Sequence, residues 1–360
     1  MASNEKHDAF IVREQDPFNG GPPPNLIAQD HVTPTNLFFS RNHAPVPNVD
    51  PDNFRLTVGG LVDRPMELSL DNLNGMPQSE VEATLQCAGN RRTDLFKLGD
   101  IPGEVEWGDE AISHAVWGGV FLEQILERAE VNAGAEHVEF VGLDEIENAG
   151  KTLGFGGSIP LWKAFVGDVL VATKMNGETL TPNHGFPARI VVPGYIGARS
   201  VKWVSQINLL AEPSANYFQA HAYKLFPPNV CPETVDWNKG LMLGELSINA
   251  AICKPMPKDK LSPGPTTISG YAFAGGERSV ARVDVSVDGG KNWIEAEMSD
   301  AKRWSWRLWS ATVDLVEGEH EIVARAWDSA GNSQPESPRQ TWNFKGYMNN
   351  AWARVAVTVR

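Results

Sequence analysis

The stretch Val283-Asp-Val-Ser-Val287, followed by Asp288-Gly-Gly290 and then Trp293, decides the fold of the last third of the chain. Apolar and polar residues alternate in it until the glycine-rich turn, which is the pattern of a β-hairpin. Two further sets of apolar residues recur at every second position, so the members of each set are expected to lie on one face of a strand. The first set is Trp304, Trp306 and Leu308, and the second is Ile322, Ala324 and Ala326. Short alternating strands of this kind predict an antiparallel sandwich of the immunoglobulin type, about 100 residues long.

The residues before this sandwich predict a different kind of domain. Residues 254–265 are rich in proline and mark the expected junction, so we place the boundary near Ala250. Glycine and proline are spread along the chain, which favours many short elements over a helical bundle. Apolar residues three to four positions apart predict a helix over 120–130. The expected fold class is therefore α+β, with an N-terminal extension over 1–34, a first domain over 35–250 and the sandwich over 251–360.

Composition excludes several classes of protein. The 360 residues carry 31 Lys and Arg against 45 Asp and Glu, a formal net charge of −14, which argues against nucleic acid as a partner because phosphate backbones need a cationic surface. No stretch approaches the ~18 apolar residues of a membrane helix, so no membrane partner is expected. Three cysteines without Cys-x-x-Cys spacing predict no disulfide framework. No secretory signal or targeting address is visible, so a reducing cytoplasm is the expected location.

One cluster in the first domain has the residue types of a reactive thiol. In Leu85-Gln-Cys87-Ala-Gly-Asn90-Arg91-Arg92, small residues beside Cys87 allow close backbone approach, and two guanidiniums follow in sequence. Such a thiol is expected to be present partly as thiolate, which is a nucleophile or a soft metal ligand. A buried, inert cysteine is the alternative, because free cysteine is among the most buried residue types.

Two further segments bring cations together in an acidic chain. His184 and Arg189 are followed by Arg199 and Lys202 among glycines, a set typical of a pocket for a phosphate or an oxyanion. The segment Ser40-Arg41-Asn42-His43 adds a third cationic run. The alternative interpretation is a loop of solvated cations in which His184 is a hydrogen-bonded core residue.

Taken together, these strings resemble the sulfite oxidase family of molybdenum–molybdopterin enzymes from about Asn36 to the C-terminus. The resemblance rests on four strings: Phe39-Ser-Arg-Asn-His-Ala-Pro-Val-Pro47, Thr84-Leu-Gln-Cys-Ala-Gly-Asn-Arg-Arg92, His184-Gly-Phe-Pro187 and Pro193-Gly-Tyr-Ile-Gly-Ala-Arg-Ser-Val-Lys-Trp203. It implies a mixed α/β molybdopterin-binding domain followed by an immunoglobulin-like dimerisation domain, and hence a homodimer. Residues 1–34 find no counterpart, and the haem domain of animal members is missing, so no haem is expected.

The resemblance also assigns roles to particular residues. Cys87 would supply its thiolate to molybdenum, and sulfite would be bound by Arg41, Arg92, Trp107 and Tyr223. The molybdopterin would lie against a set of residues from four segments: Phe39, Ser40, Arg41, Asn42, His43, Asp144, His184, Arg189, Ser200, Val201 and Lys202. The implied reaction is molybdenum-dependent oxidation of sulfite to sulfate by oxygen-atom transfer, with the electrons passed to oxygen or to a cytochrome.

One position departs from the family, and alternatives stay open. Lys345, in Trp342-Asn-Phe-Lys345-Gly346, stands where animal relatives carry an arginine that reaches the sulfite site, and lysine lacks the planar guanidinium fork. A nitrate reductase or a sulfane dehydrogenase of the same fold would carry a similar cysteine string, because fold does not decide substrate. From another class, the chain could be a non-catalytic binding protein that assembles through its sandwich.

Overall fold

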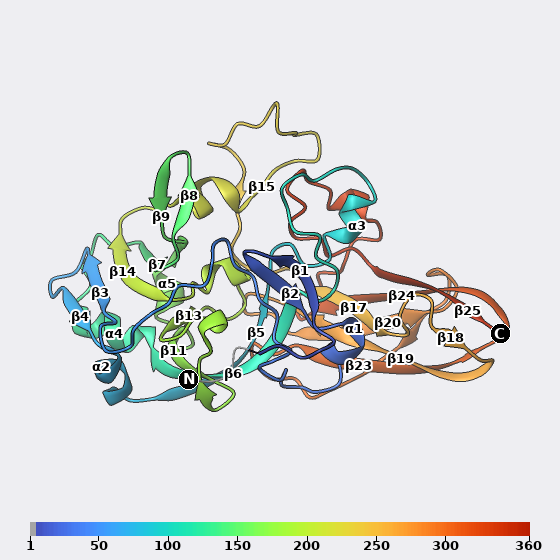
Figure 1. Ribbon diagram of the computed structural model, residues 1–360. Helices are drawn as coiled ribbons and strands as arrows, with labels where there is room; N and C mark the ends of the chain where they lie inside the picture. Colours follow the sequence, from blue (N-terminus) through green and yellow to red (C-terminus); the bar gives the residue numbers. More distant parts are fainter. Residues whose placement is uncertain (1–4) are drawn as a thin grey trace.

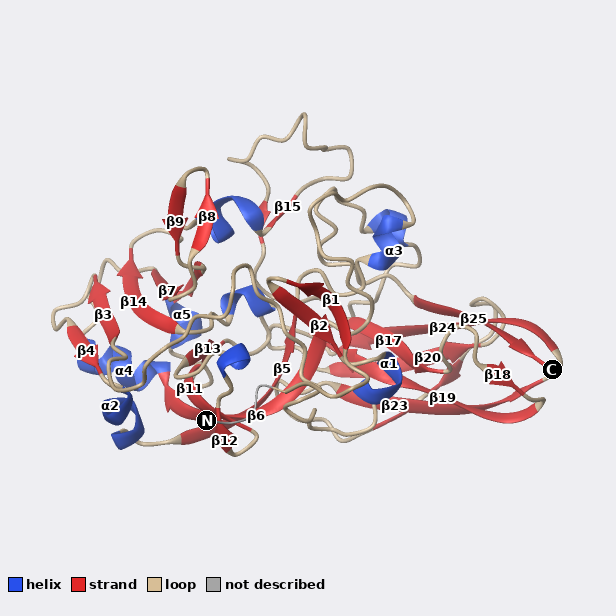
Figure 2. Cartoon of the chain, in the orientation of Figure 1, coloured by secondary structure: helices blue, strands red, loops and turns tan. Residues whose placement is uncertain are grey.

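The computed structural model describes residues 5–360 and shows two lobes (Figure 1). The first lobe holds the N-terminal two thirds of the chain, and the second is the elongated β-sandwich that ends at the C-terminus. Strands and loops dominate both lobes, and the helices are short (Figure 2). No helix among residues 5–360 is long and apolar enough to cross a membrane. The expected fold class, α+β with a terminal sandwich, is confirmed.

Two sheets form the framework of the first lobe. One has the order β10-β7-β14-β3-β4, and the other has the order β12-β11-β6-β5 with β13 paired to β11. The strands of the first sheet are β3 (Leu56–Gly60), β4 (Met66–Leu68), β7 (His137–Gly142), β10 (Gly156–Pro160) and β14 (Val204–Leu210). Those of the second are β5 (Ser79–Gln86), β6 (Ile112–Phe121), β11 (Leu170–Met175), β12 (Glu178–Thr179) and β13 (Arg189–Val191).

The helices of residues 5–360 are short. They are α1 (Pro24–Ile27), α2 (Leu70–Gly75), α3 (Thr93–Phe96), α4 (Leu122–Ala129) and α5 (Leu161–Ala164). In α4, Leu122, Ile125, Leu126 and Ala129 are all buried, so the apolar spacing that predicted a helix is the face packed on the core. The helix expected over 120–130 is confirmed, but Val120 and Phe121 belong to β6.

The sandwich consists of two mainly antiparallel sheets packed face to face. Their orders are β17-β19-β23-β22 and β18-β25-β24-β20-β21. The strands are β17 (Asn249–Lys254), β18 (Lys260–Leu261), β19 (Gly264–Phe273), β20 (Val280–Ser286), β21 (Ile294–Glu295), β22 (Glu297–Met298), β23 (Arg307–Leu315), β24 (Gly318–Asp328) and β25 (Ala353–Val359). The predicted hairpin is β20 paired with β21, in which Val285 lies opposite Ile294.

The tryptophans before β23 differ from the expectation. Ile322, Ala324 and Ala326 do line the sandwich core, but Trp304 and Trp306 precede the strand and pack into the hydrophobic clusters of the first lobe. Trp309 takes the place in the sandwich core instead. The alternation was therefore wrong for the two tryptophans, because the loop before β23 turns toward the other lobe.

The N-terminal segment is built into the first lobe. β1 (Ile11–Gln15) pairs with β2 (Phe18–Gly21), and Gly20 forms a bridge with Ser40. Asn19 Oδ1 accepts a hydrogen bond from the backbone of Asn42 at 2.6 Å. Although the boundary at residue 34 stays a prediction, the segment before it supports the loop over 39–43. Two small two-stranded sheets complete the fold: β8 (Ile146–Asn148) with β9 (Lys151–Leu153), and β15 (Lys224–Leu225) with β16 (Leu241–Met242).

Candidate active site

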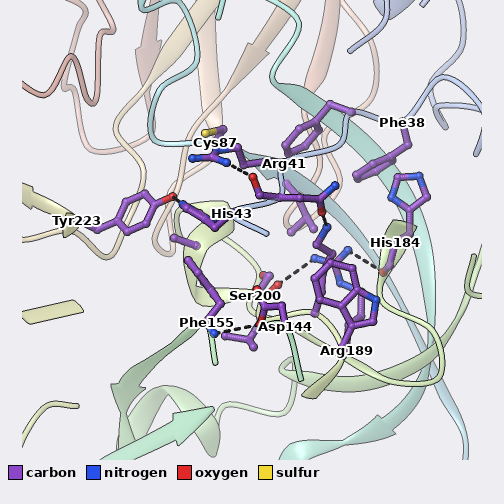
Figure 3. Close-up of a pocket in the computed structure, with 18 residues that line it drawn as sticks. Phe38, Arg41, His43, Cys87, Asp144, Phe155, His184, Arg189, Ser200 and Tyr223 are labelled. Atoms are coloured by element: carbon purple, nitrogen blue, oxygen red, sulfur yellow. Dashed lines mark hydrogen bonds between the residues drawn. The ribbon is translucent and has the colours of Figure 1, made fainter. Parts of the chain in front are cut away.

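A cavity in the first lobe collects most of the residues that the sequence singled out (Figure 3). Its lining is Phe38, Phe39, Arg41, Asn42, His43, Leu85, Cys87, Asp144, Phe155, His184, Arg189, Gly197, Ala198, Ser200, Val201, Lys202, Trp203 and Tyr223. Cys87 and Arg41 lie on one side of this group, and Asp144 and Arg189 lie on the opposite side. Four of the expected site residues do not line the cavity: Ser40, Arg92, Trp107 and Lys345.

Cys87 is held at the point where β5 ends. Its backbone N–H donates to Ala111 at 2.9 Å, and its thiol is free and buried. The Gly89 N–H lies 3.4 Å from Sγ and points a positive dipole at the sulfur. An added Cβ at Gly89 would lie 2.4 Å from the Arg92 guanidinium, so a larger residue there would displace that side chain. Gln86 also forms a bridge with Ile196, which sets the loop over 197–202 beside the thiol.

The two arginines that follow Cys87 in this segment, Arg91 and Arg92, have different roles. Arg91 is buried and donates to Asn249 Oδ1, to the Ala250 carbonyl and to the Ala351 carbonyl at 2.9, 3.0 and 2.7 Å. It therefore anchors the first lobe to the sandwich and is not part of the cavity. Only Arg92 turns toward the Cys87 side, so the sequence interpretation of two cations beside the thiol was half wrong.

The far end of the cavity is a cluster of buried cations. Arg189 donates to the carbonyls of His184 and Ser200 at 3.1 and 3.0 Å, and its guanidinium lies over the Trp117 ring. Lys202 Nζ donates to the Asn183 carbonyl at 3.0 Å and contacts Asn42 Oδ1. Carbonyl oxygens satisfy the donors but do not neutralise the charges, so the positive potential of this end remains.

The pKa values at this end are shifted accordingly. Burial, reinforced by the charge of Arg189, holds the pKa of Lys202 well below its usual range. Burial and the nearby Lys6, Lys202 and Arg189 do the same to the pKa of His184, and burial lowers the pKa of Arg189 to about 9. Asp144 is the one carboxylate among the described lining residues, and burial raises its pKa. One carboxylate does not balance Lys202 and Arg189 together, so a bound anion would supply the missing negative charge.

Lys6 is a member of this cluster that sequence reasoning missed. Its Nζ lies 2.8 Å from His184 Nε2 and donates to the Phe38 carbonyl at 2.9 Å. Burial lowers the pKa of Lys6 to about 7. No local signal pointed to it, because Lys6 and His184 are 178 positions apart.

Ser40 and Asn183 brace the cluster from behind. Ser40 Oγ accepts from Asn183 Nδ2 at 2.5 Å, and Asn42 Nδ2 donates to Asn183 Oδ1 at 3.0 Å. Ser40 thus positions the loop and does not face the cavity.

Aromatic rings and a neutral histidine form the wall near Cys87. His43 Nε2 and Tyr223 Oη share a hydrogen bond of 3.1 Å, and the His43 ring stacks on Phe155 with 4.7 Å between ring centroids. Burial, with the charges of Arg41 and Lys202, holds the pKa of His43 well below its usual range. Burial also raises the pKa of the Tyr223 phenol. Both groups are therefore uncharged at neutral pH.

Arg41 carries the charge at this end. Burial opposes that charge, but the neighbouring Tyr223 and Cys87 raise the pKa of Arg41 above its ordinary value. An arginine beside the only cavity thiol fits a small anion that meets a metal held by the sulfur.

A second layer of charged residues stands behind Arg41 and Tyr223. Arg92 donates to the carbonyls of Gly346 and Val105 at 3.0 and 2.7 Å, and its NH2 lies 3.2 Å from Glu104 Oε2. Lys345 Nζ pairs with the other oxygen of Glu104. Sequence reasoning named Arg92 and Lys345 but missed Glu104, whose neighbours lie far away in sequence.

Trp107 is fully buried and packs in the same hydrophobic cluster as Cys87. Its Nε1 has no acceptor among the described residues, which is costly for a buried donor unless a ligand completes it.

A separate group of metal-ligating side chains lies outside the cavity. His114 Nε2 and His31 Nε2 lie 3.6 and 3.9 Å from Glu82 Oε2. Lys302 Nζ already contacts both Glu82 oxygens at 2.9 Å. Because that lysine neutralises the carboxylate, the group is an ion-pair cluster that ties the sandwich to the first lobe.

Comparison with known proteins places this geometry in a family. Residues 43–218 match the family described as oxidoreductase molybdopterin binding domain, and residues 241–360 match the Mo-co oxidoreductase dimerisation domain. The chain is 42% identical to sulfite oxidase of Arabidopsis thaliana, over 97% of this chain and 94% of that protein. It is 37% identical to a nitrate reductase of Hordeum vulgare, over 99% of this chain but 42% of that protein.

Among solved structures, the sulfane dehydrogenase SoxCD of Paracoccus pantotrophus superposes with a TM-score of 0.82 at 25% identity, over 98% of this chain and 87% of that one. The identity extends through both lobes, and the cavity with Cys87 falls inside the region matched to the molybdopterin-binding domain. The chain therefore belongs to the sulfite oxidase family of molybdopterin-binding oxidoreductases.

Proposed function

We propose that the protein is a sulfite oxidase that converts sulfite to sulfate at a molybdenum–molybdopterin centre. The observation that carries this proposal is the meeting of Cys87, Arg41 and Tyr223 at one end of a buried cavity whose other end is cationic. A soft metal ligand, an anion-binding guanidinium and a neutral phenol are what a small oxyanion needs beside a thiolate-bound metal.

The residues present fit the cofactor. Cys87 provides a thiol in a pocket without a second cysteine, so molybdenum would have one protein sulfur ligand. Lys202 and Arg189 would hold the anionic part of molybdopterin, with His184 as a neutral hydrogen-bonding group, since Asp144 is the one carboxylate in the described lining. When bound, the molybdenum cofactor supplies the oxygen-atom transfer and takes up the two electrons.

The chain's own residues bind and orient the substrate. Arg41, which lines the cavity beside Cys87, would attract sulfite electrostatically. Tyr223 keeps its proton and, braced by His43, presents a directed hydrogen-bond donor or acceptor at one wall. Arg92 is fixed by two backbone carbonyls and by Glu104, so it contributes positive potential without moving.

A pair of assays tests the proposal against the nitrate reductase alternative. The molybdenum-loaded protein should oxidise sulfite with ferricyanide as acceptor and should not reduce nitrate with a reduced viologen. Activity with nitrate alone would overturn the assignment. Molybdenum content near one atom per chain separates either enzyme from a non-catalytic binding protein.

The sulfane dehydrogenase alternative has a specific observation in its favour, the TM-score of 0.82 with SoxCD. That alternative requires a sulfur-bearing protein adduct to reach Cys87. Oxidation of free sulfite at a rate that exceeds oxidation of a thiol-bound sulfane would argue against it.

The acceptor, the assembly and the location are proposals of the same kind. We propose oxygen or a separate cytochrome as electron acceptor, to be decided by steady-state rates with each. The match to a dimerisation domain supports a homodimer through the sandwich, and the molar mass in solution tests it. A reducing cytoplasm is the proposed location, supported by the free thiols of Cys87, Cys231 and Cys253; fractionation of cells tests it.

A further inference from the structure

Glu104 is a carboxylate that lies close to a site expected to bind an anion. Its side chain is 11% exposed and meets two cations at once, Arg92 at 3.2 Å and Lys345 in direct contact. The Tyr347 hydroxyl lies 3.5 Å from the same carboxylate. Within the described residues, the two cations behind Arg41 therefore share one carboxylate.

This group is in contact with the wall that faces Cys87. The Tyr347 ring stacks on Tyr223 with 5.3 Å between ring centroids and an interplanar angle of 18°. The Arg92 guanidinium lies 5.1 Å from the centre of the Tyr347 ring. Only one ring thus separates Glu104 from Tyr223, so a charge on Glu104 is felt by an anion bound beside Arg41.

The two cations on Glu104 differ in their freedom to move. Arg92 is 2% exposed and is also fixed by Gly346 and Val105. A Cβ on Gly346 would lie 2.7 Å from the Arg92 side chain, so the loop is closed tightly over it. Lys345 is 22% exposed, and Glu104 is the anion it contacts. Lys345 is therefore the adjustable cation of the pair.

The charge of the ligands makes this arrangement selective. Near neutral pH, sulfite exchanges between its singly and doubly charged forms, whereas sulfate is doubly charged. A fixed carboxylate next to an anion site penalises a doubly charged ligand more than a singly charged one, because the repulsion scales with the charge. It also competes with the ligand for Lys345.

We propose that Glu104 is a specificity-determining residue that weakens binding of the doubly charged product sulfate by holding Lys345 away from it. This inference rests on the proposed sulfite oxidase function. Glu104 keeps Arg92 oriented at the same time, so the site retains its shape while its affinity for the product is lowered. A lysine suits this role, because its single ammonium can move from the carboxylate to another anion without a planar fork to realign.

The test measures sulfate binding to the molybdenum-loaded protein by calorimetry, together with sulfite KM and kcat. Glu104→Gln preserves the size and the acceptor oxygen and removes the charge. We expect the sulfate Kd to fall about tenfold and the sulfite KM to fall by a smaller factor. The matched control is Glu106→Gln, the same change two positions away on an exposed residue, which should move both constants less than twofold. An unchanged or larger sulfate Kd in Glu104→Gln would overturn the proposal.

Lys345→Met keeps the proposal testable if Glu104→Gln loses its cofactor. Removing the adjustable cation should raise the sulfate Kd several-fold, and in the double variant the gain from Glu104→Gln should shrink below about twofold. A sulfate Kd unaffected by Lys345→Met, in a protein with the native melting temperature, means that the pair is only structural. Sulfate binding is measured whatever reaction the protein catalyses, so an absence of sulfite oxidation would contradict the proposed function and not this inference.

Discussion

The two ends of the cavity handle positive charge in opposite ways. At the far end, Lys6, His184, Arg189 and Lys202 face one another with Asp144 as the one carboxylate in the lining. At the Cys87 end, Arg92 and Lys345 are each paired with Glu104. An end that is left uncompensated suits a resident anion that stays bound, and an end that is compensated suits ligands that come and go.

The largest effect should come from the thiol of Cys87. Cys87→Ser removes the soft ligand, so we expect sulfite oxidation to fall by at least about 10³-fold while the pterin stays bound by the cationic end. Activity, pterin fluorescence and melting temperature are measured together. Cys231→Ser, a partly exposed cysteine outside the cavity, is the control and should retain wild-type rates. Near-wild-type turnover in Cys87→Ser contradicts the assignment.

Removing a cation from the far end of the cavity should lower the cofactor content and not the turnover of the molecules that keep their cofactor. Lys202→Met removes a buried cation, so the content of molybdenum and pterin should fall by about tenfold or more. The cofactor-free variant should be at least as stable as the wild type, because burying that charge without an anion is unfavourable. Lys174→Met, an exposed lysine, serves as the control. Normal cofactor content in Lys202→Met is the contrary outcome.

At the Cys87 end, the removal of one hydroxyl group should lower turnover by a smaller factor. Tyr223→Phe keeps the ring stacked on Tyr347 and loses the hydroxyl shared with His43. We expect kcat/KM for sulfite to fall about tenfold, since one directed hydrogen bond is lost. Cofactor content should not change, which distinguishes this end from the other. Tyr217→Phe, a more exposed tyrosine, should leave both quantities as they were.

The smallest effect concerns stability and pH in the cofactor-free protein. Burial lowers the pKa of Lys6 to about 7, against an ordinary 10.5, so between these values the unfolded chain binds a proton that the folded chain does not. The free energy of unfolding should therefore rise with pH in this window, by about 1–2 kcal/mol between pH 7 and 9. Urea unfolding at both values measures it.

Lys6→Met should lessen that rise, and Lys291→Met, at an exposed site, should not. Burial also lowers the pKa of Lys202, so Lys202 accounts for the rise that remains in Lys6→Met, whereas an unchanged slope in Lys6→Met would contradict the assignment to Lys6.

Short-range signals were sufficient for much of the fold and of the site. The alternation over 283–287 and the turn after it produced β20 and β21 as expected, because the side-chain period of a strand is a property of neighbouring residues. The cations from His184 to Lys202 also lie in one loop region, so their meeting was visible in sequence. Cys87 with its glycine was recognisable for the same reason.

The sequence by itself determined the element types, the sandwich, the thiol and the family, since these depend on local spacing and on strings that survive in a linear alignment. Only the tertiary structure decided which charges meet: Lys6 with His184, 178 positions apart, and Glu104 with the loop of Lys345 and Tyr347, 243 positions from the latter. It also turned Arg91 to the sandwich and Arg92 to the site. The physical reason is that charge pairing depends on distance in space and burial, and neither is encoded in the spacing of residues along one strand or loop.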